Sequence, residues 1–139
     1  MNKIEHIGIA VKNIEDSEKL YSLMLNSKPY KREIVASEGV ITSFFKTGDS
    51  KIELLASQNT DSAIAKFIEK RGEGIHHIAF EVDDIEKEIA RLTDNGFELI
   101  NKTTKRGADN KIIAFLHPKS TNGVLIELCM EAKMNKNNV

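Results

Sequence analysis

The sequence has one cysteine, no tryptophan, two prolines and a net charge of only −1. One cysteine excludes an internal disulfide framework and is typical of a reducing compartment, so we expect a cytoplasmic protein. The near-zero charge gives no global attraction to nucleic acid or to an anionic membrane, and we expect neither as a partner. No apolar run approaches membrane-spanning length, and the N-terminus enters a strand pattern without an apolar leader.

One segment of the chain is repeated in its second half. His77 lies 71 residues after His6, and the hydrophobic residues around the two histidines align at the same distance. These aligned pairs are Ile4 and Ile75, Ile7 and Ile78, Val11 and Val82, and Ile14 and Ile85. Glu53 and Glu127 align in the same way, within Ile-Glu-Leu segments that lie 74 residues apart. Each half therefore carries a histidine on its first strand and a glutamate on its last.

Hydrophobic periodicity predicts the same order of elements, β-α-β-β-β, in both halves. We predict an α+β fold built from two tandem modules, residues 1–70 and 71–130, within a single domain 1–130. Asn13 and Ser62 are predicted helix N-caps. Residues 102–111 are polar and contain glycine, which indicates a mobile loop, and residues 131–139 are predicted to form a flexible tail.

The repeat-equivalent residues His6, Glu53, His77 and Glu127 are candidate metal ligands. Two imidazoles and two carboxylates suit a divalent ion such as Co²⁺, Ni²⁺, Zn²⁺ or Mn²⁺, and leave two octahedral positions open. Such residues are more often solvated surface groups, but four at equivalent positions favour a site. Strand alternation places His76 on the face opposite His77, at the surface or behind the ligands. Cys129 is predicted to be a small buried residue without an activated thiolate.

The chain resembles the glyoxalase-like, vicinal-oxygen-chelate superfamily and, within it, the methylmalonyl-CoA epimerase family. The resemblance spans almost the whole chain short of the tail. The histidine strand is common to the superfamily, whereas the His117-Pro118-Lys119-Ser120 turn before Gly-Val-Leu-Ile-Glu-Leu is more specific to the epimerases. The matching stretches are His6–Val11, Ile52–Leu55, Ile64–Ile85, Phe115–Ser120 and Gly123–Leu128.

This resemblance implies an open, cup-shaped mixed β-sheet with the helices on its outside. It implies a divalent metal held by His6, Glu53, His77 and Glu127, with Co²⁺ first in order and Ni²⁺, Mn²⁺, Zn²⁺ or Mg²⁺ as alternatives. It also implies a homodimer that acts on an acyl-CoA. The reaction would interconvert the (R) and (S) epimers of methylmalonyl-CoA through removal of the C2 proton and an enolate intermediate.

Exchange of a proton on both faces of C2 requires two acid/base groups. Glu127 is the first candidate and Glu53 the second, although some epimerases carry glutamine at the Glu53 position. Some also carry a catalytic glutamate where Thr42 stands, so the second base is not assigned by the resemblance. Lys119, Ser120 and Thr42 are predicted substrate contacts. Two other functions share the pattern: a glyoxalase I-type lactoylglutathione lyase, and a member of the superfamily that binds a small molecule without turnover.

Overall fold

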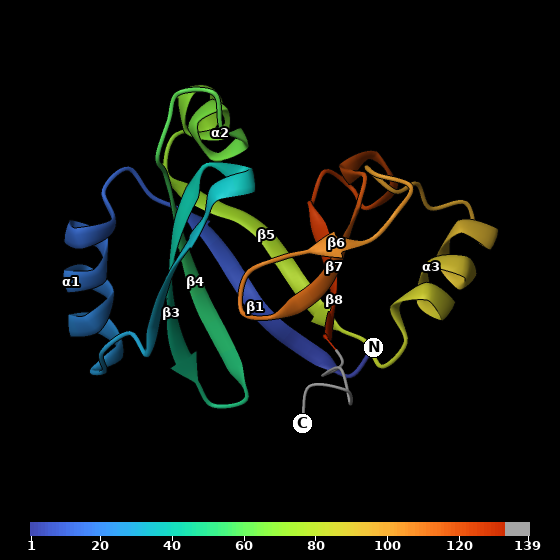
Figure 1. Ribbon diagram of the computed structural model, residues 1–139, viewed down its shortest axis with the longest axis horizontal. Coiled ribbons are helices and arrows are strands. Elements are labelled where there is room, and N and C mark those ends of the chain that lie inside the picture. Colours follow the sequence, from blue (N-terminus) through green and yellow to red (C-terminus); the bar gives the residue numbers. More distant parts are fainter. Residues whose placement is uncertain (133–139) are drawn as a thin grey trace.

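A computed structural model describes residues 1–132 and shows one mixed β-sheet of eight strands. Their order across the sheet is β2-β3-β4-β1-β5-β8-β7-β6. The sheet curls into an open half-barrel, with α1 and α3 on its two flanks and α2 above it (Figure 1). The elements are β1 (Lys3–Ala10), α1 (Ile14–Leu25), β2 (Lys31–Val35), β3 (Val40–Thr47), β4 (Ser50–Ser57), α2 (Ala63–Arg71), β5 (Gly74–Glu81), α3 (Ile85–Asp94), β6 (Lys105–Arg106), β7 (Lys111–Leu116) and β8 (Ile126–Glu131).

The predicted α+β class with paired βαβββ units is confirmed. β1-α1-β2-β3-β4 forms the first unit and β5-α3-β6-β7-β8 the second, while α2 connects them. The first strands of the units, β1 and β5, pair antiparallel at the centre of the sheet. Each first strand also pairs in parallel with the last strand of its own unit, β1 with β4 and β5 with β8. The four strands that carry the repeated His and Glu residues are therefore neighbours.

Both predicted helix caps are confirmed. The Asn13 side chain accepts a hydrogen bond from the backbone N–H of Asp16, and the Ser62 hydroxyl accepts one from Ala65. Each bond satisfies a backbone donor that has no partner within the first turn of its helix. These caps fix where α1 and α2 leave the sheet.

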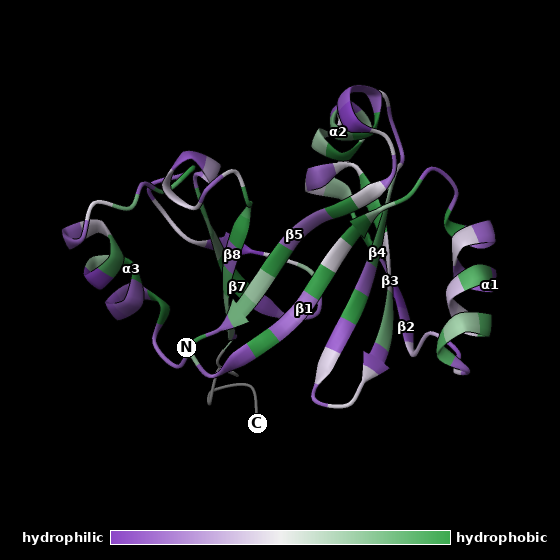
Figure 2. Ribbon diagram, turned by 180° about the vertical axis from the view of Figure 1, so that it is seen from behind, coloured by the Kyte–Doolittle hydropathy of each residue, from purple (hydrophilic) through white to green (hydrophobic). Residues whose placement is uncertain are grey.

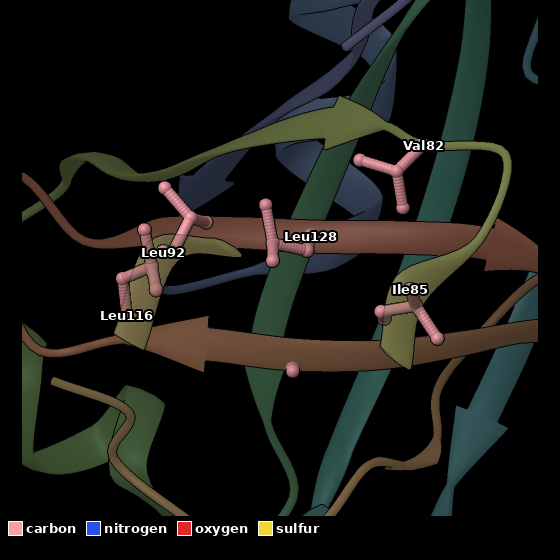
Figure 3. Close-up of a cluster of buried hydrophobic side chains, with 6 residues drawn as sticks. Val82, Ile85, Leu92, Leu116 and Leu128 are labelled. Carbon is pink, nitrogen blue, oxygen red and sulfur yellow. The ribbon is translucent and has the colours of Figure 1, made fainter. Parts of the chain in front are cut away.

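Each unit packs its helix against the outer face of the sheet through a hydrophobic core. In the second unit, α3 covers β7 and β8 through buried residues that Figure 3 shows as sticks: Val82, Ile85, Leu92, Leu116 and Leu128. The corresponding core under α1 includes Val11, Ile14, Phe45 and Leu54. Burying one such side chain contributes about 1.5–3 kcal/mol. Because both cores lie on the outer face, the inner face of the half-barrel is free to carry polar groups.

Residues 102–111, which are predicted to form a mobile loop, make specific contacts with both units. Lys105 and Arg106 form β6, which pairs with β7, and the following turn reaches the first unit. There the Asp109 carboxylate binds the Lys51 ammonium at 2.8 Å and the Lys31 ammonium at 3.2 Å. Lys105 makes a second connection between the units, to Glu38 at 2.6 Å. These partners lie far away in the sequence, so local polarity could not reveal them.

Between α3 and β6 the chain touches the sheet at one point, an isolated bridge between Leu99 and Leu116. At the start of the predicted tail Glu131 belongs to β8 and Ala132 is buried, and residues 133–139 lie outside the described part. Among residues 1–132, none of the helices combines the length and the apolar character needed to cross a lipid bilayer.

Candidate metal centre

Four adjacent strands at the centre of the sheet each contribute one polar side chain to a single cluster. Across the strands β4, β1, β5 and β8 these are Glu53, His6, His77 and Glu127, and each is at most 6% exposed. Buried charged or ionisable groups are rare unless they are paired or bind an ion. The structure thus brings together all four residues that the repeat singled out.

The potential ligand atoms of the cluster converge on one point. The Nε2 atom of His6 lies 3.0 Å from Nε2 of His77, 3.0 Å from Glu53 Oε2 and 3.4 Å from Glu127 Oε2. The Nε2 atom of His77 lies 3.6 Å from an oxygen of each glutamate. Two imidazole nitrogens and two carboxylates in this arrangement are donors that suit a divalent transition metal.

Gly8 makes room for the His77 ring. It is the residue of β1 that pairs with His77 across the central strands. A Cβ atom at this position would overlap the His77 imidazole at Cε1, so any larger residue would displace the ring. The glycine thus leaves beside His6 a space that the second histidine fills.

The two residues before the histidines, Glu5 and His76, also join the cluster. Glu5 is buried, and its Oε1 lies 3.0 Å from Nδ1 of His6. Nδ1 of His76 lies 2.9 Å from Nδ1 of His77, so the prediction that His76 is on the opposite face is wrong. Sequence reasoning missed Glu5 altogether. The available signal was that position 76 is also 71 residues after position 5.

The charges of the cluster favour a cation among its carboxylates. Burial opposes the charged form of His6, but hydrogen bonds with Glu5 and Glu53 outweigh this and raise its pKa to about 10. Burial also acts against ionisation of Glu53, yet its bonds to the two histidines bring its pKa well below the ordinary value. Without a metal ion, a proton on His6 therefore offsets part of the negative charge of the surrounding carboxylates.

Glu127 behaves differently from Glu53. Burial raises its pKa, and the nearby positive charges of the histidines only partly offset this effect. Paired carboxylates whose environments drive their pKa values apart are typical of acid/base sites. Glu127 is therefore the better suited of the two to exchange a proton.

We expect the metal-free protein to lose stability as the pH rises from 6.5 to 10. His6 titrates near 6.5 when unfolded but near 10 when folded, so within this window only the folded state holds the proton. The stabilisation is complete below pH 6.5 and disappears as the pH passes the folded pKa, with a slope of at most about 1.4 kcal/mol per pH unit. Urea denaturation of the chelator-treated protein at several pH values measures it. A stability that stays level across this window would contradict the assignment.

A second grouping of ionisable residues, Glu5 with His6 and Cys129, does not have the same character. Cys129 is fully buried, its thiol donates to the Phe80 carbonyl oxygen at 3.5 Å, and burial raises its pKa. A thiol that remains protonated is a poor metal ligand. Cys129 is the small buried residue that the sequence indicated.

A cavity of about 250 Å³ opens above the cluster. Glu53, His77 and Glu127 lie at its floor and apolar side chains form much of its wall, including Phe115, whose ring meets that of His77 edge-on at 5.8 Å. Lys105 and Arg106 of β6 also line this cavity. A mostly apolar cavity with a few convergent polar groups is typical of a small-molecule site.

The cavity continues into a larger groove of about 730 Å³ beside α2. The two spaces share the residues Ala63, His76, His77 and Leu125. Three cationic residues of α2 line the groove, namely Lys66, Lys70 and Arg71, and Glu69 is the one acidic residue that lines it within the described part of the chain. Together the two spaces can accommodate a long anionic molecule whose reactive end reaches the cluster.

The three predicted substrate contacts, Thr42, Lys119 and Ser120, do not meet at one place as the predicted metal ligands do. Thr42 is buried in the cavity wall, and its hydroxyl donates to the Glu33 carbonyl oxygen at 3.1 Å. Lys119 and Ser120 line neither space: the Lys119 ammonium binds the Glu98 carboxylate at 2.8 Å, and the Ser120 hydroxyl accepts from the Glu98 backbone N–H. Their neighbour Pro118 does line the groove. Their contact with a substrate stays a prediction.

The chain is similar to several known proteins over nearly its whole length. The family model described as Glyoxalase/Bleomycin resistance protein/Dioxygenase superfamily matches residues 5–115. An uncharacterized protein of Bacillus subtilis (strain 168) is 40% identical over 99% of this chain and 98% of its own. The mitochondrial methylmalonyl-CoA epimerase of Dictyostelium discoideum is 39% identical over 92% of this chain and 78% of its own. An ethylmalonyl-CoA/methylmalonyl-CoA epimerase of Cereibacter sphaeroides is 36% identical, over 92% and 97%.

Solved structures give the same result. A hypothetical protein from Bacillus halodurans C-125 has a TM-score of 0.92 at 46% identity, covering 98% of this chain and 99% of that one. Methylmalonyl-CoA epimerase from Mycobacterium tuberculosis has a TM-score of 0.89 at 35% identity, over 94% and 88%. A single-residue variant of the Streptomyces coelicolor epimerase, in complex with 2-nitronate-propionyl-CoA, has a TM-score of 0.89 at 33% identity, over 96% and 99%.

Proposed function

The chain belongs to the glyoxalase/bleomycin resistance protein/dioxygenase superfamily, and from this we propose that it is a methylmalonyl-CoA epimerase. It is an isomerase that interconverts the two C2 epimers of an acyl-CoA thioester. The observation that carries the proposal is the convergence of His6, His77, Glu53 and Glu127 at the floor of a cavity, in a chain that matches epimerases over nearly its full length.

The four buried donors would hold one divalent metal ion, with Co²⁺ as our first choice and Ni²⁺, Mn²⁺, Zn²⁺ or Mg²⁺ as alternatives. Two nitrogen and two oxygen donors favour the transition ions over Mg²⁺, which prefers oxygen. When bound, such an ion supplies positive charge that stabilises negative charge developing on the substrate oxygens. The pKa of His6 is high only because it stands between carboxylates, so a cation of higher charge can displace its proton.

The proton of methylmalonyl-CoA that must move is at C2, between the thioester and the carboxylate. Its removal leaves a carbanion whose charge spreads onto the oxygens of both groups as an enolate. Glu127 accepts or returns this proton, since its burial raises its pKa toward a value at which a carboxyl group can do both. Delivery of the proton to the opposite face of C2 completes the change of configuration.

The second acid/base group in our proposal is Glu53. Glu53 and Glu127 stand on β4 and β8, on opposite flanks of the β1–β5 pair that carries the histidines. Two carboxylates that approach from opposite sides suit proton transfer at the two faces of a planar enolate. Thr42 lies in the same cavity with its hydroxyl occupied by a backbone carbonyl, and we assign it a role in shaping the wall.

We place the CoA portion in the groove beside α2, where Lys66 and Lys70 stand one helical turn apart and exposed. Phosphate groups of CoA are anionic and would be attracted to these ammonium groups and to Arg71. Lys119 and Ser120 stay predicted contacts; they line neither space, but they follow Pro118, which lines the groove.

Charge reversal in this groove should weaken substrate binding and leave the chemistry intact. We expect Lys66→Glu with Lys70→Glu to raise KM for methylmalonyl-CoA about tenfold with little change in kcat, because the phosphates lie far from C2. Steady-state kinetics at low and high salt measures this, and the effect should shrink as salt screens the charges. Lys19→Glu, an exposed change on α1, is the matched control. An unchanged KM would show that the CoA portion binds elsewhere on the protein.

The proposal includes a homodimer. None of the helices within residues 1–132 covers the centre of the outer face of β1 and β5, and hydrophobic residues alternate along both strands there (Figure 2). Ile4 on β1 is 41% exposed. A second copy packed on this face would bury it, and light scattering on the purified protein should report the mass of two chains. A cytoplasmic location also remains part of the proposal, supported by the unpaired thiol of Cys129.

The direct test of the reaction compares two substrates. The metal-loaded protein should convert one epimer of methylmalonyl-CoA into the mixture of both, and should leave the hemithioacetal of methylglyoxal and glutathione unchanged. Turnover of the hemithioacetal alone would show a lactoylglutathione lyase. Binding without turnover of either compound would place the chain among the superfamily members that only bind small molecules.

A further inference from the structure

Two β-bulges interrupt the pairing of the central strands, one immediately before each histidine of the metal centre. In β1, Ile4 and His6 pair with the consecutive residues Phe80 and Ala79, so Glu5 is an extra residue. In β5, Ile75 and His77 pair with the consecutive residues Ile9 and Gly8, so His76 is the extra residue there. A bulge turns a side chain that would otherwise alternate to the other face. Both extra residues thereby lie on the same side as the histidine that follows.

The Glu5 carboxylate fixes the orientation of His6. It pairs with the Lys51 ammonium at 3.1 Å and lies 3.0 Å from Nδ1 of His6. A carboxylate in an ion pair accepts hydrogen bonds and does not donate them, so the contact with Nδ1 is an N–H donated by the imidazole. When a metal ion takes the place of the proton on Nε2, the proton that remains on His6 stays at Nδ1 and Nε2 faces the cluster.

His76 makes the equivalent contact in the second unit. Its Nδ1 lies 2.9 Å from Nδ1 of His77, and the Phe67 ring meets the His76 ring edge-on at 5.0 Å and restricts its orientation. If Nε2 of His77 binds a metal ion, the neutral imidazole carries its single proton at Nδ1. His77 is then the donor and His76 the acceptor.

We infer that Glu5 and His76 are matched positioning residues, each of which accepts the Nδ1 proton of the next histidine and so presents its Nε2 atom to the metal. The inference rests on the metal site of the proposed function. Acceptors behind metal-binding histidines orient the ring and make the ligand more basic. Here one acceptor is a carboxylate and the other a neutral imidazole, so the two halves of the repeat support their ligands with different strength.

The burial of Glu5 does not serve only to give Lys51 an anionic partner. Lys51 also binds Asp109 at 2.8 Å, so the lysine keeps an anionic partner when Glu5 is replaced. Lys51 in turn ties Glu5 to the turn that connects the two units. A chain of contacts therefore runs from His6 to Glu5 on β1, to Lys51 on β4 and then to Asp109 of the second unit.

The test uses variants that keep or remove the acceptor at nearly constant shape. Glu5→Met and His76→Phe remove it, whereas Glu5→Gln and His76→Asn keep an oxygen that can accept from Nδ1. Affinity for Co²⁺ and Zn²⁺ is measured by competition with a chromophoric chelator. The protonated nitrogen of each ring is identified by long-range ¹H–¹⁵N NMR of the zinc-loaded, ¹⁵N-histidine-labelled protein, in which the chain has only four histidines to assign.

We expect the zinc-loaded wild type to show His6 and His77 protonated at Nδ1. Glu5→Met and His76→Phe should each lower metal affinity about 10–100-fold and alter the signals of the following histidine, while Glu5→Gln and His76→Asn retain most of the affinity. Equal losses for the matched variants at one position would show a purely space-filling role and overturn the inference, as would unchanged affinity in all four. These readouts need no acyl-CoA, so a protein that failed as an epimerase could still confirm them. A wild type that bound neither metal would overturn both proposals.

Discussion

Glu127→Gln is expected to lower kcat for epimerisation about 10³-fold while the protein stays folded. Glutamine preserves the size of the side chain but cannot accept and return a proton at C2, and loss of a general acid or base costs about 10²–10⁴-fold. The substitution also removes an acid that is costly to bury, since burial raises the pKa of Glu127. Kinetics at saturating Co²⁺, with the bound metal measured in the same sample, separates loss of the proton carrier from loss of a ligand.

The matched control is Glu15→Gln on α1. The side chain of Glu15 is 63% exposed and pairs with Arg32 at 3.6 Å, away from the residues that line the cavity and the groove, so its replacement should leave kcat unchanged. A Glu127→Gln enzyme that binds metal and turns over at the wild-type rate would show that Glu127 is only a ligand. Glu53 would then be the first residue to examine for proton transfer.

Removal of the metal is expected to abolish activity and to lower the melting temperature. The four ligands come from four strands and both units, so an ion bound to them stabilises only the folded arrangement. An ion at about 1,000 times its Kd stabilises the folded state by about 4 kcal/mol. Treatment with EDTA followed by dialysis, assay and calorimetry measures both effects.

Addition of Co²⁺ should restore both activity and thermal stability, whereas Ca²⁺ should restore neither. Ca²⁺ prefers six to eight oxygen ligands, and half of the donors here are imidazole nitrogens. Full activity in protein shown to be metal-free would contradict the proposed role of the cluster. Restoration by Ca²⁺ as effective as that by Co²⁺ would contradict the ligand set.

The meeting of His6, Glu53, His77 and Glu127 in one cluster could be predicted from the sequence because these residues repeat. Alternation places His6 and Glu53 on defined faces of their strands, and the second unit repeats both choices in His77 and Glu127. The fold then needs only to pair the first strands of the two units for all four to meet.

The support behind the histidines could not be predicted by the same rule. Strict alternation would place Glu5 and His76 on the outer face of the sheet. They lie on the inner face because a bulge occurs at each of these positions. A bulge depends on how two strands pair, and no residue type within β1 or β5 marks it. The contact between Asp109 and Lys51 was hidden for a similar reason, because it joins a turn of one unit to a strand of the other.

The most direct test of the account follows hydrogen at C2. The cobalt-loaded protein is incubated in D₂O with one epimer of methylmalonyl-CoA, and deuterium at C2 is followed by mass spectrometry beside an EDTA-treated control. We predict that the metal-loaded protein incorporates deuterium as it forms the other epimer, and that the EDTA-treated control does not. Absence of exchange in the metal-loaded protein would contradict it.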